Sequence, residues 1–222
     1  CTTDGGAGMA GALGVKFFDN DNRKFIPVGG TLGEISRIDV SGLLKEIKDC
    51  TVLGMCDVDN PLFGVNGAAY VYGPQKGANH ESVLNLDRGL EHLSNQLIEH
   101  FKLDVAKKPG AGAAGGFGAG ILAFLNGALE SGIGTVLDTV GFDTLLKDTD
   151  MVFTGEGKID GQSLRGKVVA GVSGRAKKQK VPVIAVVGDI GDDTDGIYEA
   201  GVSAIVSINR VAVPFSIAAA RC

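Results

Sequence analysis

Short apolar runs alternate along this chain with amphipathic or small-residue segments. Residues 51–55, 151–153, 182–187 and 204–208 have the length and the β-branched content of buried strands. Residues 81–102 place their leucines at helical spacing, which predicts one long amphipathic helix. Alternating buried strands and helices are typical of the α/β class, so we expect a mainly parallel sheet covered by helices on both faces.

Shorter patterns give further local expectations. Residues 15–18 and 24–28 flank the turn-rich residues 19–22, which predicts a β-hairpin at about residues 15–28. Residues 5–13, which follow Thr2-Thr3-Asp4, are expected to form a small-residue helix capped by Asp4 or Thr3. Residues 65–72 fit a helix or a strand, and residues 138–146 fit an irregular segment or a short helix. Other helices are expected over residues 42–48 (capped by Ser41), 121–129, 164–178 and 194–200.

One stretch, residues 154–163, concentrates polar chemistry. It follows the apolar run at 151–153, and we expect it to form a turn between that strand and the helix at 164–178. Ligands of open α/β sheets sit at the carboxyl ends of strands, and helix N-termini favour anions. The plain alternative is a glycine-rich turn with solvated charges. The polar side chains of this stretch are Glu156, Lys158, Asp160, Gln162 and Ser163.

Composition narrows the class of protein. The 222 residues include 35 glycines, and the net charge of −5 with a pI near 5.2 argues against a nucleic-acid partner. The four cysteines form no CxxC pair and no zinc-type cluster, which favours a reducing, cytoplasmic compartment. No apolar stretch reaches the ~18 residues of a membrane span. We therefore expect a small-molecule substrate, no nucleic acid and no membrane, with homo-oligomerisation left open.

Two nucleotide-binding motifs are matched only in part. Gly110-x-Gly112-x-x-Gly115 has dinucleotide spacing, but it follows Lys107-Lys108-Pro109 and not an apolar strand. Gly161-x-x-x-x-Gly166-Lys167 resembles a Walker A loop, but Val168 stands where a Ser or Thr would bind Mg²⁺. Neither motif supports a Rossmann or P-loop site, although the 110–120 glycines can still hold a phosphate at the next helix start.

Several polar loops nevertheless contain what phosphoryl transfer requires. Acids hold Mg²⁺ and orient the accepting hydroxyl, while lysine and backbone N–H groups neutralise phosphate oxygens. These loops contain Asp4; Asp57, Asp59 and Asn60; Gln75 and Lys76; the glycines of 110–120; Glu156 to Ser163; and Asp189.

At these residues the chain resembles the type I family of bacterial glycerate kinases. Five motifs occur in the family's order and cover the chain from end to end. They are Thr3-Asp4-Gly5-Gly6-Ala7-Gly8-Met9, Cys56-Asp57-Val58-Asp59-Asn60-Pro61-Leu62, Gly73-Pro74-Gln75-Lys76-Gly77-Ala78, Pro109-Gly110-Ala111-Gly112-Ala113-Ala114-Gly115-Gly116 and Thr154-Gly155-Glu156-Gly157-Lys158-Ile159-Asp160-Gly161-Gln162-Ser163.

The resemblance implies a kinase that uses ATP and Mg²⁺ to phosphorylate glycerate, with D-glycerate and its 2-hydroxyl favoured. It also implies two α/β domains with the active site between them. The chain would then be a central fragment, one α/β domain plus part of a second, and could be inactive alone. Three positions depart from the family pattern: Cys1 replaces a small residue, Thr3 replaces Asn, and Lys158 replaces Arg. Lysine keeps the positive charge but cannot form the two parallel hydrogen bonds that a guanidinium makes to a carboxylate or a phosphate.

Residue roles follow as hypotheses. Asp160 is expected to orient the attacking hydroxyl or accept its proton; the alternative is a helix cap. The remaining expectations are catalytic roles for Asp57 and Lys158; metal binding by Glu156 and Asp57; substrate contacts from Asp4, Asp59, Asn60, Gln75, Lys76, Gln162 and Ser163; and nucleotide contacts from Gly110, Gly112, Gly115 and Gly116.

Each of these residues also has a plain reading. The acids can bond to nearby backbone N–H groups in their turns, the lysines can be solvated, and the 110–120 glycines can serve close packing. At the level of function, the alternatives are a non-catalytic α/β domain that senses a hydroxy acid or a nucleotide, another small-molecule kinase or a phosphatase.

Overall fold

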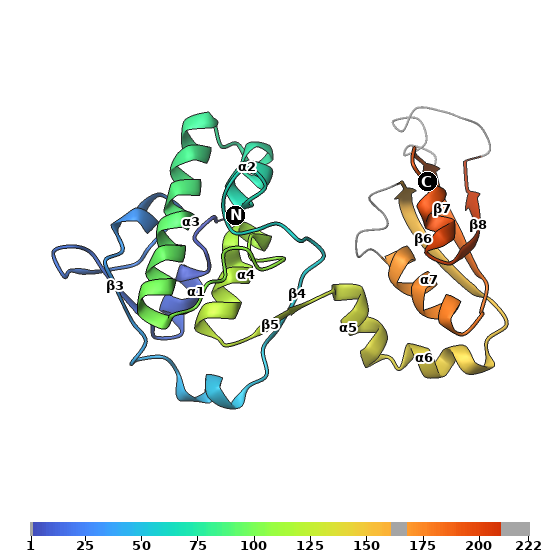
Figure 1. The fold of residues 1–222 in the computed structure, drawn as a ribbon, viewed down its shortest axis with the longest axis horizontal. Helices are drawn as coiled ribbons and strands as arrows, with labels where there is room; N and C mark the ends of the chain where they lie inside the picture. Colours follow the sequence, from blue (N-terminus) through green and yellow to red (C-terminus); the bar gives the residue numbers. More distant parts are fainter. Residues whose placement is uncertain (1, 161–167, 210–222) are drawn as a thin grey trace. The chain divides into compact units, whose positions relative to one another are not determined.

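The computed structural model describes residues 2–160 and 168–209, and it contains two compact units. The first unit is Cys1–Glu130 and the second is Ser131–Cys222 (Figure 1). Each unit has its own hydrophobic core. Gln162 and Ser163 lie outside the described residues.

The first unit combines helices with two small sheets. Its elements are α1 (Ala7–Ala12), β1 (Lys16–Phe18), β2 (Lys24–Phe25), the 3₁₀ helix η1 (Gly29–Glu34), β3 (Arg37–Asp39), η2 (Lys45–Asp49), β4 (Leu53–Met55), α2 (Ala68–Tyr72), η3 (Pro74–Lys76), α3 (His80–Phe101), α4 (Ala113–Phe124) and β5 (Ala128–Glu130).

The predicted hairpin is confirmed and gains a third strand. β1 pairs antiparallel with β2, placing Phe17 opposite Phe25, and with β3, placing Phe17 opposite Ile38. The turn is held by Asp19, whose carboxylate accepts the backbone N–H groups of Asp21 and Arg23 at 2.9 and 2.8 Å. Because these bonds keep Asp19 within its turn, the structure supports the plain structural reading of this acid.

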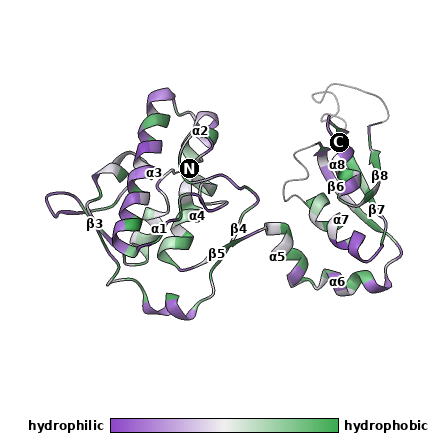
Figure 2. Ribbon diagram, viewed as in Figure 1, coloured by the Kyte–Doolittle hydropathy of each residue, from purple (hydrophilic) through white to green (hydrophobic). Residues whose placement is uncertain are grey.

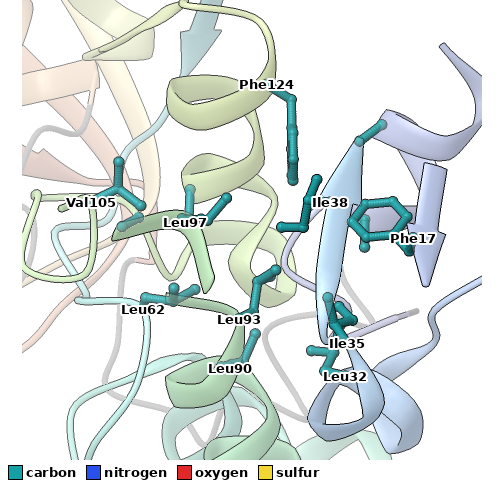
Figure 3. Close-up of a cluster of buried hydrophobic side chains, with 14 of the residues drawn as sticks. Phe17, Leu32, Ile35, Ile38, Leu62, Leu90, Leu93, Leu97, Val105 and Phe124 are labelled. Atoms are coloured by element: carbon teal, nitrogen blue, oxygen red, sulfur yellow. The ribbon is translucent and has the colours of Figure 1, made fainter. Parts of the chain in front are cut away.

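The long helix predicted at residues 81–102 is confirmed as α3. Asn79 caps its start by accepting the Ser82 N–H at 2.8 Å, and Lys102 ends it in the left-handed region. Leu90, Leu93 and Leu97 of this helix are buried in the core of the first unit, together with side chains of the hairpin, η1 and α4 (Figure 3). The fully buried members of this core include Phe17, Leu32, Ile35, Leu62, Leu90, Leu93 and Leu97.

Two local predictions in the first unit are wrong. Ser41 caps no helix: its own N–H donates to Asp39 Oδ1 at 2.9 Å, and a 3₁₀ helix follows only at Lys45–Asp49. The helix predicted at 121–129 instead begins at Ala113 and ends at Phe124, and Ala128–Glu130 forms a strand. That strand pairs in parallel with β4, a contact between distant segments that local pattern cannot reveal. Residues 65–72, left open above, contain the helix α2.

The second unit is a three-stranded parallel sheet with helices. Its elements are α5 (Gly132–Thr139), α6 (Phe142–Leu145), η4 (Leu146–Asp148), β6 (Val152–Ile159), α7 (Val168–Lys178), β7 (Val183–Ile190), α8 (Asp195–Glu199) and β8 (Val202–Ser207). The strand order is β6-β7-β8, and Val183 pairs with Val152 on one side and Val202 on the other. The segment left open at 138–146 is the end of α5 followed by α6.

One face of this sheet packs on α7 and α8. Val169 of α7 and Ile197 of α8 share a core with Ala185 and Val187 of β7. The opposite face carries Phe153, which is 67% exposed, and further exposed apolar residues of β7 and β8. Much of these two strands has the green of hydrophobic residues in Figure 2. The predicted α/β class, with parallel sheets flanked by helices, is therefore confirmed. The parallel strands are β4 and β5 in the first unit and β6, β7 and β8 in the second. None of the described helices is both long and apolar enough to span a membrane.

Candidate active site

The polar stretch at 154–163 is a strand over most of its described length, not a turn. β6 continues from Val152 to Ile159, so Glu156 and Lys158 lie within the strand, and Asp160 follows directly after it. The sequence suggested a turn because glycines at 155 and 157 normally weaken a strand. Pairing with β7 overrides that preference, because the parallel register continues to Ile159, which pairs with Ile190.

The ends of β6 and β7 bring charged groups together. Lys158 pairs in register with Asp189. Beyond the strands, the Gly191 N–H donates to the Ile159 carbonyl at 2.8 Å, and a Cβ on Gly191 would lie 2.8 Å from Lys158 Cε and 3.0 Å from Asp160 Cβ. Lys158, Asp160 and the turn after β7 therefore form one polar cluster at the carboxyl end of a parallel sheet, where ligands of α/β proteins bind.

In the first unit, three segments predicted as site loops meet through their backbones. The Gly5 N–H donates to the Gly115 carbonyl at 3.1 Å, and the Gly112 N–H donates to the Asn60 carbonyl at 3.0 Å. The segments 2–8 and 56–62 are thus both bonded to the glycine-rich segment 110–120. These three segments therefore share one region of the fold, and their ligand contacts stay predictions.

The glycines of this region permit that close approach. A Cβ on Gly112 would lie 2.2 Å from the Pro61 carbonyl oxygen, and one on Gly115 would lie 2.0 Å from the Thr2 carbonyl oxygen. Gly110 and Gly116 have equally little room. A Cβ on Gly110 would lie 2.8 Å from Cys56 Sγ, and a Cβ on Gly116 would lie 2.8 Å from Leu62 Cδ1. Packing alone therefore requires glycine at these positions, and their predicted nucleotide contacts stay a prediction.

The start of α4 has unusual backbone geometry. Ala114, Gly115 and Gly116 have φ values of 51°, 73° and 89°, all in the left-handed region. Ala114 is exposed, and its Cβ makes this conformation costly by roughly 1–2 kcal/mol. Segment 110–120 therefore holds a strained turn before its regular helix, a feature that clusters at ligand-binding sites in general.

Asp4 is buried, and its carboxylate bonds to the backbone at the start of the first helix, whose N-cap residue is Gly6. Its Oδ1 accepts the Gly6 N–H at 3.1 Å and its Oδ2 accepts the Gly8 N–H at 3.0 Å, while its exposed fraction is 7%. Both carboxylate oxygens therefore accept N–H groups at the start of α1, but the predicted N-cap residue, Asp4 or Thr3, is wrong because Gly6 occupies that position in the left-handed region. The predicted substrate contact of Asp4 stays a prediction.

Segment 56–62 presents its polar side chains to solvent. Asp57 and Asp59 are exposed and Asn60 is half-buried. The Cys56 thiol donates to the Val58 carbonyl at 3.0 Å, which closes the turn beneath Asp57. Sequence reasoning missed one residue here: Tyr72 of α2, whose hydroxyl lies 2.6 Å from Asn60 Oδ1. Burial, reinforced by Cys56 and Asp59, raises the pKa of Tyr72 above its usual value of 10.0.

Gln75 and Lys76 follow Tyr72 on the short helix η3. Both side chains are exposed, so they are accessible to a ligand. Because η3 comes directly after Tyr72, and Tyr72 contacts Asn60, the residues 73–78 join the same region as segment 56–62.

The predicted metal ligands are divided between the units: Asp57 lies in the first and Glu156 in the second. Among residues 2–160 and 168–209, no group of three His, Cys, Asp or Glu side chains forms a metal site. Carboxylates are the protein ligands that Mg²⁺ commonly takes in kinases, and the metal-binding roles of Asp57 and Glu156 stay predictions.

Comparison with known proteins decides the family. The family model described as "Glycerate kinase family" matches residues 1–221. This chain belongs to the glycerate kinase family. Its relatives include a Bacillus cereus protein named "Glycerate kinase", 45% identical over 207 residues, which span 93% of this chain and 54% of that protein. A second is an Escherichia coli protein named "Glycerate 2-kinase", 44% identical over the same shares.

A solved structure agrees with this glycerate kinase assignment. The structure titled as a putative glycerate kinase 2 from Salmonella typhimurium LT2 superposes with a TM-score of 0.79 at 40% identity. The match covers 92% of this chain and 53% of that one. The chain thus spans about half the length of the relatives it matches.

Proposed function

We propose that this chain is the central part of a kinase that transfers the γ-phosphate of ATP to glycerate, converting D-glycerate to 2-phosphoglycerate. The observation that carries the proposal is the family match over residues 1–221, together with relatives named glycerate kinases. The E. coli relative, named "Glycerate 2-kinase", favours the 2-hydroxyl as the acceptor. The chain contributes one α/β domain through its first unit and part of a second through its second unit.

The chemistry of the candidate residues suits this reaction. Glycerate is a small anion with two hydroxyl groups, so its site needs N–H or cationic donors and a carboxylate acceptor. Asn60, Gln75 and Lys76 supply donors in the first unit, and Lys158 supplies a cation in the second. Asp160 orients the attacking hydroxyl, which requires only that a carboxylate oxygen accept its proton or its hydrogen bond. Gln162 and Ser163 are proposed as further substrate contacts.

ATP and Mg²⁺ complete the proposed reactants. When bound, the metal neutralises the charge of the transferring phosphoryl group. Asp57 and Glu156 are the proposed carboxylate ligands, and the strained start of α4, with Gly115 and Gly116, is the proposed nucleotide contact. The polypeptide's own task is to hold these groups and to exclude water from them.

A non-catalytic sensor of a hydroxy acid or a nucleotide is the second candidate. The exposure of Asp57 and Asp59 and the packing role of the glycines are compatible with binding alone. A sensor would bind ligand without turnover, whereas a phosphatase would release inorganic phosphate from a phosphorylated acid.

A coupled assay of ADP release separates these candidates. It should use a polypeptide of family length that contains this chain, with Mg–ATP and either D-glycerate, L-glycerate or no acceptor. We expect ADP release that depends on D-glycerate and saturates with it. Glycerate binding without turnover by the folded polypeptide would overturn the proposal and support the sensor.

A further inference from the structure

Asn60 is held by three hydrogen bonds from three different segments. Its Oδ1 lies 2.6 Å from the Tyr72 hydroxyl, and its Nδ2 donates to the Asn66 carbonyl at 2.8 Å. Its backbone carbonyl accepts the Gly112 N–H at 3.0 Å. Because a backbone carbonyl can only accept, the Asn66 bond fixes which end of the amide is nitrogen. The Tyr72 hydroxyl must therefore be the donor to Oδ1.

This arrangement determines what Asn60 can offer a ligand. A side-chain amide has two N–H donors and one carbonyl acceptor. Tyr72 occupies the carbonyl, and Asn66 occupies one of the N–H groups. The second N–H is the donor left for a ligand, on a side chain that is half-buried.

We propose that Tyr72 is a positioning residue, whose hydroxyl locks the Asn60 amide so that its second N–H donates to an oxygen of glycerate. The inference rests on the proposed function for the identity of the ligand. The lock itself rests on the contacts among Tyr72, Asn60 and Asn66 alone.

The surroundings of Tyr72 suit a permanent donor. Burial first, and then Cys56 and Asp59, raise the pKa of its hydroxyl above 10.0, so the group keeps its proton throughout the neutral range. Tyr72 also ends α2, directly before Gln75 and Lys76 on η3. The hydroxyl group of Tyr72 therefore links segment 56–62 to residues 73–78, and both segments are predicted to contact substrate.

Loss of the lock would release the amide to rotate. Without the Tyr72 hydroxyl, Oδ1 and Nδ2 could exchange places, at the cost of the Asn66 bond. The donor would then face glycerate for only part of the time, which weakens binding of the acceptor without touching ATP.

The kinetic test compares Tyr72→Phe with Tyr70→Phe, which removes a hydroxyl from the same helix, in a polypeptide of family length. We expect Tyr72→Phe to raise the KM for glycerate about threefold to tenfold, the usual cost of one hydrogen bond, with kcat and the KM for ATP within about twofold. Tyr70→Phe should change none of them. An unchanged KM for glycerate in Tyr72→Phe would overturn the proposal.

A double-mutant cycle separates positioning from general support. Asn60→Ala should raise the KM for glycerate at least as much as Tyr72→Phe, and adding Tyr72→Phe to Asn60→Ala should raise it no further. Independent, multiplying effects would mean that Tyr72 acts through another route and would overturn the proposal. Urea unfolding of each variant shows whether a change in KM reflects loss of folded protein.

A spectroscopic test does not depend on the reaction. In the 222-residue chain, the side-chain amide signals of Asn60 should shift and exchange faster with water in Tyr72→Phe but not in Tyr70→Phe. Unchanged Asn60 signals would overturn the lock whatever the enzyme does. Absence of glycerate-dependent turnover in the unmutated polypeptide, with the Asn60 signals responding as expected, would instead count against the proposed function.

Discussion

The Gly112 N–H donates to the Asn60 carbonyl at 3.0 Å, and Gly112 can reach that position because it has no side chain. A Cβ there would lie 2.2 Å from the carbonyl oxygen of Pro61, the next residue along. The same absence of a side chain at Gly115 admits the Thr2 carbonyl. Segments 2–8 and 56–62 therefore both contact the glycine-rich segment 110–120 through their backbones.

The first prediction concerns these contacts. Gly112→Ala should lower the free energy of unfolding by about 1–3 kcal/mol, because the new methyl group would force the 56–62 and 110–120 segments apart. Urea unfolding followed by circular dichroism measures this in a chain that has no tryptophan.

Gly11→Ala is the matched control. Gly11 lies in α1, and a Cβ there would meet no other atom within 4 Å, so alanine should be neutral or slightly stabilising. Equal stability of Gly112→Ala and the unmutated chain would contradict the packing account and leave ligand contact as the reason for this glycine.

The second prediction concerns Asp4. Asp4→Asn replaces one acceptor oxygen with an N–H group facing the backbone N–H of Gly6 or Gly8. The loss of one of these hydrogen bonds to a buried carboxylate should cost about 1–2 kcal/mol in the free energy of unfolding. Asp49→Asn, at an exposed position in η2, should change it little. If Asp4→Asn unfolds like the unmutated chain, these two hydrogen bonds do not stabilise the fold.

The third prediction is a pH dependence in the second unit. Arg175 of α7 binds Asp138 of α5 at 2.6 Å and Asp143 of α6 at 3.1 Å. The hydrogen bond from Arg175 lowers the pKa of Asp138 below its usual 3.8, so the stabilisation is present above about pH 4 and is lost as the pH falls through the lowered value.

Amide hydrogen exchange of α5 measures this effect. Asp138→Asn should speed exchange in Gly132–Thr139 at pH 7, and its difference from the unmutated chain should shrink toward zero below about pH 4. Asp148→Asn, at an exposed position in η4, is the control. A difference that persists unchanged at low pH would show that the carboxylate charge contributes nothing.

Elements with strong local periodicity were predictable from the sequence. The leucines of α3 repeat at helical spacing, and the turn residues 19–22 between two apolar runs predicted the hairpin. Elements made of small residues were not predictable. α4 begins among alanines and glycines that show no hydrophobic period, and β6 extends through Gly155 and Gly157 only because β7 lies beside it.

Candidate site residues could be picked out from the sequence to a similar extent, and their roles stay predictions. Asp4, Asp57, Asn60 and the 110–120 glycines stood out because polar or glycine clusters follow strands or open helices. Tyr72 gave no local signal, since an aromatic residue in a short helix usually belongs to the core. Its role depends on a contact with Asn60, twelve residues away, which only the folded chain displays.

The fourth prediction concerns Asp160. In a polypeptide of family length, Asp160→Asn should lower kcat by about 10²–10⁴ because the amide cannot accept the proton of the attacking hydroxyl. Its free energy of unfolding should stay within about 0.5 kcal/mol of the unmutated value. Asp150→Asn, at an exposed position before β6, is the control. Matching losses of activity and stability in Asp160→Asn would favour the helix-cap role instead.

The proposed phosphorylation of glycerate at its 2-hydroxyl can be checked by phosphorus NMR of the product. D-glycerate and Mg–ATP are incubated with a polypeptide of family length that contains this chain, and the proton coupling of the new phosphate signal is recorded. We predict a doublet, because the phosphate of 2-phosphoglycerate is attached to a carbon with a single hydrogen. A triplet from 3-phosphoglycerate, or inorganic phosphate alone, would contradict the account.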